Sequence, residues 1–190
     1  MNQPTILSTD FFVRDTRMVA RELLGKVIYR QVDELLYRAV ITETEAYHGT
    51  DDLACHCSKG KTPRTEIMYK KGGHIYIYLI YGMHLMLNFV CMPEDFPAAV
   101  LIRGIKDLSV SRHPLASKTI DVKTDGPGKL TKHLQIEKEL NGKFLSAKNG
   151  LWVADEHVDL SKYAIQTTPR IGIDYAQEWK NKPWRFVLVK

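Results

Sequence analysis

A short hairpin signal constrains the fold of this chain more than any other feature. Residues 75–79 and 85–90 predict two paired strands, because successive side chains of a strand point to opposite faces. Tyr81, Gly82 and Met83 fall at the connecting turn, where glycine can adopt a positive φ angle. A large ring at a hairpin tip is well placed to enter a stack of bases, although Tyr81 could instead fold back onto its own sheet.

The first strand of this hairpin has two chemically different faces. Tyr76 and Tyr78 share one face, and the aliphatic residues between them share the other. The return strand carries Asn88 after an apolar run. A buried amide needs partners, so Asn88 is either satisfied by the backbone or presented to a ligand.

A second strand, predicted over residues 37–47, carries acidic side chains beside an aromatic ring. Strict alternation places Ile41, Glu43, Glu45 and Tyr47 on one face. Two ionised carboxylates so close together repel each other when buried, so we expect one to be solvated or paired. The other could serve as a general base. The alternative is an edge strand whose acids face solvent.

The overall composition is that of one soluble domain. A chain of 190 residues, 44% hydrophobic and 26% charged, can bury a core. A net charge of only +5 means that any nucleic-acid footprint is a local patch. Three cysteines suggest no disulfide framework, and we see neither a secretion signal nor a membrane span of ~18 apolar residues. We therefore expect a protein that is not secreted, cytoplasmic in bacteria or nuclear in eukaryotes.

Strands outnumber helices in the remaining pattern and do not alternate with them, which argues against a doubly wound sheet. Residues 48–71 form a long polar stretch, which is typical of a functional loop or of one ordered by a partner. The other expected elements are helices over 16–24 and 130–140, a weakly indicated helix within 108–115, and strands over 27–31, 100–105, 151–153, 164–167 and 184–189.

Taken in order, these segments resemble the alkyladenine DNA glycosylases, also called 3-methyladenine or N-methylpurine DNA glycosylases. The resemblance rests on residues 43–47, 61–64, 76–83, 101–103, 126–130, 169–179 and 182–186, together with His56 and Asn88. It covers nearly the whole chain. The ordered series is highly specific, although no single piece of it is.

The resemblance implies an α+β fold of one domain, residues 1–190, around a curved, mostly antiparallel sheet with a protruding β-hairpin. It also implies a monomer that binds double-stranded DNA and needs no cofactor or metal. The expected reaction is hydrolysis of the N-glycosidic bond of a flipped, damaged purine, which leaves an intact abasic site. The expected substrates are 3-methyladenine and 7-methylguanine, with hypoxanthine and ethenoadenine as further candidates.

For the reaction itself, the resemblance assigns four residues. Glu45, rather than Glu43, matches the catalytic acid, and Arg103 matches the arginine near that acid and the target phosphate. Tyr81 matches the tyrosine that intercalates where the nucleotide has left, with Met83 beside it.

For the base pocket, the resemblance assigns four more. Tyr47, His56 and Tyr78 match residues that line the pocket and stack on the extruded purine. Asn88 matches the amide whose bulk disfavours the 2-amino group of normal guanine. The chain departs from the family pattern at His48, at the strand residues His84 and Met86, and at the cysteines on either side of His56, which bears on the bases that fit.

Phosphate contacts are expected from basic residues of the long polar stretch. An alternative is that this stretch is a solvated loop that stays mobile without DNA. The residues concerned are Lys59, Lys61, Arg64, Lys70 and Lys71.

Other functions fit parts of the pattern less well. Cys55, His56 and Cys57 look like metal ligands, but consecutive side chains point in different directions and no second ligand pair has suitable spacing. Residues 126–129 resemble part of a phosphate-binding loop, but Leu130 replaces the required serine or threonine. Two rivals remain open: a non-catalytic nucleic-acid-binding domain, and a hydrolase with a small-molecule pocket.

Overall fold

The computed structural model describes residues 4–112, 117–119 and 126–190. Its strands are β1 (Thr5–Ile6), β2 (Val27–Val32), β3 (Leu35–His48), β4 (Ile75–Ile80), β5 (His84–Val90), β6 (Ala98–Ser111), β7 (Ser117–Thr119), β8 (Leu151–Asp155), β9 (Ala164–Thr168) and β10 (Arg185–Val189). Its α-helices are α1 (Thr9–Phe12), α2 (Thr16–Glu22) and α3 (Pro127–His133). Its 3₁₀ helices are η1 (His56–Lys59), η2 (Glu66–Tyr69), η3 (Lys138–Leu140), η4 (Ala147–Asn149) and η5 (Gln177–Asn181).

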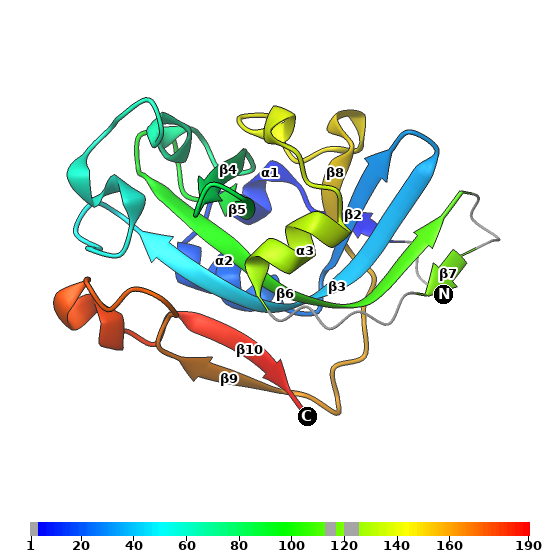
Figure 1. Ribbon diagram of the computed structural model, residues 1–190. Helices are drawn as coiled ribbons and strands as arrows, with labels where there is room; N and C mark the ends of the chain where they lie inside the picture. Colours follow the sequence, from blue (N-terminus) through cyan, green and yellow to red (C-terminus); the bar gives the residue numbers. More distant parts are fainter. Residues whose placement is uncertain (1–3, 113–116, 120–125) are drawn as a thin grey trace.

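The described strands join into one curved sheet, and all of their pairings are antiparallel (Figure 1). The main path runs β1-β8-β2-β3-β6-β5-β4, while β7 pairs with β6, and β10 pairs with both β3 and β9. With few helices packed on this sheet, the α+β class expected from the resemblance is confirmed.

The long strand β3 lies in the interior of the sheet. It pairs with β6 over most of its length, with β2 along its first half and with β10 along its second half. Glu43 faces Gly104 on one side and Val187 on the other, and Glu45 faces Leu101 and Arg185. The acidic segment is therefore not an exposed edge.

The strict alternation predicted for residues 41–47 is wrong, because β3 contains a bulge. The register with β6 shifts between Ile41 and Glu43 and again between Glu43 and Thr44. An extra residue in one strand changes which face the following side chains occupy. Ile41 is therefore buried in the main hydrophobic core instead of sharing the face of Glu43 and Glu45. The Thr44 hydroxyl donates to the carbonyl oxygen of Ala20 in α2, at 2.7 Å.

Helix α2 begins where expected and ends at Glu22; it packs against β3 and β6, whereas α3 packs against β5 and β6. The Asp15 carboxylate accepts a hydrogen bond from the backbone N–H of Arg17 and caps its N-terminus. The apolar side of α2 lies in the core with the aliphatic residues of β3 and β6. Gly25, with φ of 82°, lets the chain leave the helix.

The helix predicted over residues 130–140 is wrong in extent. The chain forms α3 and then η3, interrupted at Gln135, whose φ is 49°. The side-chain amide of Gln135 donates to the Tyr37 hydroxyl, and the backbone carbonyl oxygen of Gln135 accepts from Arg30 Nε at 3.2 Å. Leu134 and Leu140 are nevertheless both buried, so the apolar pattern reflects core contacts rather than one continuous helix.

The helix proposed within residues 108–115 is also wrong where the structure describes it. Residues 108–111 continue β6, because Val110 and Ser111 pair with Tyr37 and Leu36 of β3; residues 113–115 lie outside the described residues. The short elements β1, α1 and β7 were not anticipated.

Candidate active site

Glu45 is buried without any exposed surface on the sheet face opposite α2. Its Oε2 accepts a hydrogen bond from the Tyr47 hydroxyl at 2.8 Å, and its Oε1 accepts one from the backbone N–H of Ile171, also at 2.8 Å. Burial raises the pKa of Glu45 above its usual value, while the charge of Arg103 and these two donors oppose that rise. A buried carboxyl with such tuned surroundings is typical of a catalytic group.

The neighbouring carboxylate, Glu43, is the paired one. Its Oε1 contacts Arg185 Nε at 2.6 Å and Arg103 Nε at 3.0 Å. Arg103 also reaches Glu45, with 3.4 Å between Nε and Oε1. Glu43 is therefore paired, as expected for one of the two acids, and Arg103 contacts both carboxylates.

A cavity of about 760 Å³ opens beside the residues that contact Glu45. Its walls come from β4, β5 and β6, from the N-terminal end of α3, from the segment after β9, and from single residues of β3, η1 and η2. Seven predicted site residues line it together, namely Tyr47, His56, Arg64, Tyr78, Tyr81, Asn88 and Arg103. Glu45 does not line the cavity itself but contacts three residues that do, namely Tyr47, Arg103 and Ile171.

The ring wall of the cavity is built from β4 and η1. The rings of His56 and Tyr78 meet edge to face with centroids 4.5 Å apart. His56 Nδ1 lies 2.9 Å from the hydroxyl of Tyr76. The sequence pattern places Tyr76 on the same face as Tyr78 but assigns it no function. Burial, helped by the positive charge of Arg64, lowers the pKa of His56 to about 4. The imidazole is therefore neutral at pH 7.

Asn88 is fixed by the backbone while it lines the cavity. Its amide nitrogen donates to the carbonyl oxygens of Tyr76 and Met86, each at 3.2 Å. Among the described residues, no donor pairs with its side-chain oxygen. The backbone therefore satisfies the amide nitrogen, and Asn88 lines the cavity at the same time.

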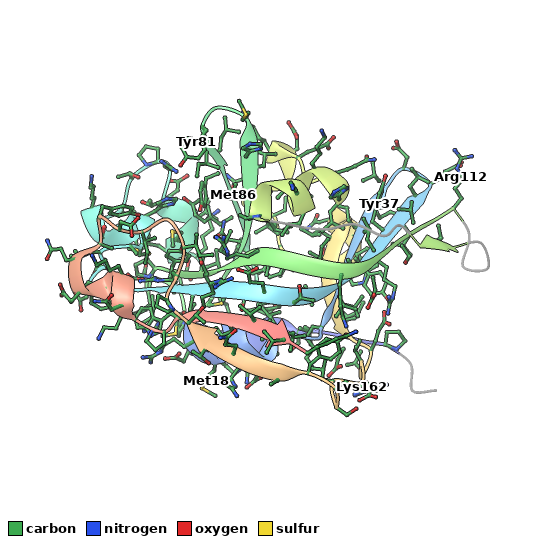
Figure 2. All side chains as sticks on the ribbon, turned by 60° about the horizontal axis from the view of Figure 1, so that its bottom comes forward. Met18, Tyr37, Tyr81, Met86, Arg112 and Lys162 are labelled. Atoms are coloured by element: carbon green, nitrogen blue, oxygen red, sulfur yellow. The ribbon has the colours of Figure 1, made fainter. Side chains whose placement is uncertain are left out.

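The hairpin tip projects from the body of the molecule, with Tyr81 at its end and far from Met18 of α2 (Figure 2). Tyr81 is 84% exposed and Met83 is 72% exposed. Tyr81 and Gly82 both adopt positive φ, at 50° and 69°. The ring does not fold back onto its own sheet, and the turn presents two large apolar side chains to solvent.

The predicted basic residues of the polar stretch are all exposed, but their surroundings differ. Arg64 lines the cavity, with its guanidinium carbon 5.3 Å from the centroid of the Tyr78 ring. Lys61 lies over the Tyr69 ring at 5.3 Å. The stretch itself is folded, since it contains η1 and η2 and buries Cys57 and Met68.

The cysteines beside His56 are buried free thiols. A hydrogen bond with Cys57, together with burial, raises the pKa of the Cys55 thiol. Within the described part of the chain, no cluster of three or more histidine, cysteine or acidic side chains could hold a metal ion.

Sequence reasoning missed the contribution of the segment that follows β9. Ile171 reaches Glu45 through its backbone N–H, and a backbone contact leaves no trace in the side-chain type. The side chain of Arg170 has no exposed surface, and the sequence includes this residue only as part of the family resemblance.

Comparison with known proteins agrees with this geometry. A family model described as methylpurine-DNA glycosylase matches residues 10–190. A protein of Bdellovibrio bacteriovorus is 44% identical over 185 residues, covering 96% of this chain and 95% of that relative. A protein of Rickettsia felis is 43% identical over 188 residues, covering 99% and 96%. One of Natranaerobius thermophilus is 41% identical over 191 residues, covering 96% and 94%. All three bear the name "Putative 3-methyladenine DNA glycosylase".

The chain belongs to the methylpurine-DNA glycosylase family. It is thus a DNA glycosylase of the class that acts on methylpurines, a DNA-binding hydrolase of base excision repair. In this glycosylase, His84 and Met86 line the cavity, but His48 does not. The His48 ring instead approaches the Thr16 hydroxyl at 3.1 Å. Across the described residues, no helix is long and apolar enough to cross a membrane.

We expect the imidazole of His56 to titrate near pH 4 instead of 6.5, because burial and Arg64 disfavour its protonated form. The unfolded chain takes up this proton at a higher pH than the native chain. The free energy of unfolding should therefore fall as the pH drops from 6.5 towards 4. An NMR titration of the ring protons measures the midpoint, and His56→Gln should remove this part of the pH dependence. A midpoint near 6.5 would contradict the burial argument.

Proposed function

We propose that this glycosylase flips an alkylated or deaminated purine out of duplex DNA and hydrolyses its N-glycosidic bond. One observation carries the proposal: a fully buried carboxylate, Glu45, is held by oriented donors directly behind the wall of a ring-lined cavity. A plain binding domain has no need of such a group, because burying a charged carboxylate is unfavourable.

In the proposed reaction, Glu45 accepts a proton from water while the water oxygen bonds to the C1′ carbon of the deoxyribose. The electron pair of the broken N-glycosidic bond leaves with the base. The carboxylate charge also stabilises the oxocarbenium-like sugar, as it does in other glycosidases. Because Glu45 has no exposed surface, the side chains in front of it must shift enough to admit one water molecule.

The base selected by this site is an electron-poor purine. The rings of Tyr47, Tyr78 and His56 can stack on it, and a cationic base gains roughly 0.5–2 kcal/mol over such a face. 3-Methyladenine and 7-methylguanine are cationic in DNA and leave readily. Hypoxanthine and ethenoadenine are neutral and need a proton to leave, so they are the more demanding candidates. A damaged or mispaired base also costs less to flip.

The exposed hairpin tip acts on the DNA rather than on the bond. Tyr81 enters the space vacated by the flipped nucleotide, and Met83 lies beside it in the minor groove. Arg103, next to Glu45, also reaches the target phosphate. The other phosphate contacts come from the exposed basic side chains, namely Lys59, Lys61, Arg64, Lys70 and Lys71, so that binding weakens steeply with salt.

The product is an intact abasic site. No lysine is assigned as a nucleophile towards the sugar, so the enzyme is monofunctional and leaves the strand unbroken. The chain acts as a monomer without metal or cofactor. Incubation with a lesion duplex, followed by mild alkali, separates this outcome from lyase activity, which would break the strand before alkali is added.

Replacement Glu45→Gln should abolish excision while DNA binding is retained, because the amide keeps the shape but cannot take a proton from water. We expect a loss of roughly 100- to 10,000-fold in single-turnover excision. Excision is measured as free base released from a duplex with one 3-methyladenine or hypoxanthine. The exposed Glu178 offers a control of the same chemistry, Glu178→Gln, which should leave the rate unchanged. Full activity in the Glu45 variant would favour a different catalytic group.

Replacement Tyr81→Ser should weaken excision from duplex DNA, because the vacated stack loses its filling ring. Base–aromatic stacking is worth about 1–3 kcal/mol, which corresponds to roughly 5- to 150-fold. The same lesion in single-stranded DNA should be affected much less. Ile6→Ser removes another exposed apolar side chain at the opposite end of the strand order and serves as the control. An unchanged rate in the Tyr81 variant would instead favour a hydrolase with a small-molecule pocket, in which the hairpin tip takes no part in turnover.

Replacement Asn88→Ser should increase the release of guanine-type bases, because a smaller side chain leaves room for the 2-amino group. The backbone contacts that hold the Asn88 amide at the cavity wall are the basis for this expectation. The measurement is the ratio of 7-methylguanine to hypoxanthine release, together with release of normal guanine. An unchanged ratio would remove the proposed selective role of the amide.

A further inference from the structure

A buried ion pair fastens the segment after β9 to the sheet beside the proposed active site. Arg170 Nη1 donates to Asp52 Oδ2 at 2.6 Å, and Nη2 donates to Asp52 Oδ1 at 2.8 Å. Neither side chain has any exposed surface. This two-pronged geometry is the strongest form that an arginine–carboxylate contact takes in proteins.

Both partners of this pair hold backbone as well as each other. Arg170 Nη1 also donates to the carbonyl oxygen of Ala46 at 2.9 Å. Asp52 accepts from the backbone N–H groups of His48 and Ala54, at 3.2 and 3.1 Å. The pair therefore joins the end of β3, the loop that follows it and the distant segment after β9.

The same arginine lies next to both hydrogen-bond donors that hold Glu45: it precedes Ile171 in the chain and contacts the Tyr47 ring. The next residue, Ile171, donates its backbone N–H to Glu45 Oε1 at 2.8 Å. The Arg170 guanidinium carbon lies 4.8 Å from the ring centroid of Tyr47 and 5.0 Å from that of Trp184. Tyr47 in turn donates its hydroxyl to Glu45 Oε2. Movement of Arg170 would therefore disturb both hydrogen bonds.

We propose that Arg170, locked by Asp52, is a positioning residue that sets the orientation and proton affinity of Glu45 through the Ile171 backbone and the Tyr47 ring. Arg170 does not line the cavity and makes no contact with the base or the sugar. This inference rests on the function proposed above, in which ionised Glu45 is the base.

The predicted pH dependence follows from the groups around Glu45. The ionisable groups that face it are Arg103 from β6, Tyr47 and Glu43 from β3, and Tyr78 from β4. Hydrogen bonds to the ionised form keep a carboxyl pKa low, so losing them raises it. Activity that needs the carboxylate would then be lost at a higher pH as the solution is acidified.

The test compares Arg170→Lys and Asp52→Asn with the parent enzyme in single-turnover excision from pH 4 to 9. We expect the acid limb of the rate profile to move up by about one pH unit. The maximal rate should fall by roughly 100-fold, as small misplacements of catalytic groups can cause. The affinity for lesion DNA should change little. A lowered Tm with an unmoved acid limb would overturn the proposal and leave the pair a structural role.

The matched control is Arg38→Gln. Arg38 lies on the first half of the same strand and pairs with Glu156, away from Glu45. Its loss should lower the Tm without moving the acid limb. If it moved the limb as far as Arg170→Lys does, the effect would be general loosening of β3 and the proposal would fail.

A second measurement avoids variants that fail to fold. Replacing the amide at Ile171 by an ester, by incorporating the α-hydroxy acid analogue of isoleucine at position 171, removes the N–H that reaches Glu45 and keeps every side chain. The acid limb should again rise, and an unmoved limb would overturn the proposal. Parent enzyme that releases no base at all would instead refute the proposed function, so the two failures are distinguishable.

Discussion

The burial of one carboxylate organises this structure. Removing Glu45 from water strongly disfavours its charged form, and only nearby donors and positive charge can offset that cost. The Tyr47 hydroxyl, the Ile171 N–H and Arg103 supply this compensation. They come from β3, from the segment after β9 and from β6, so a charged interior site requires all three parts of the chain to be in place.

The sheet separates the proposed catalytic group from the side chain proposed to enter the DNA. Glu45 lies on an interior strand with hydrogen-bonded neighbours on both sides, where its backbone has little freedom. Tyr81 lies at the tip of a two-stranded projection and is largely exposed (Figure 2). The cavity connects them, with Tyr78 and Asn88 on the strands that lead from the body to the tip. This arrangement suits a rigid reaction centre beside a wedge that meets a deformable duplex.

Local patterns predicted much of this fold because they follow directly from side-chain chemistry. The alternation around Tyr76 and Tyr78 placed both rings on the cavity side, and the turn at Gly82 fixed the position of the tip. The resemblance then brought the distant ring and amide residues to one site. The structure shows that these residues lie together at one cavity, and their catalytic and DNA-binding roles stay predictions.

Other features could not be predicted because they depend on distant contacts. The bulge that separates Ile41 from the face of Glu43 arises from register with β6. Gln135 breaks the expected helix because Tyr37 and Arg30 hold it in a left-handed conformation. The Ile171 N–H carries no side-chain signature at all. In each case the partner lies far away in sequence, beyond what a local pattern records.

The pairing of β3 with β10 has a consequence for how the enzyme matures. Glu43 and Arg185 touch across 142 residues of sequence, so the strand beside Glu45 docks only after most of the chain has been made. Such distant pairings form slowly during folding. The β4–β5 hairpin is local and can form early. In a nascent molecule the hairpin would therefore form before β10 lies beside β3, and the surroundings of the proposed catalytic carboxylate would be completed last.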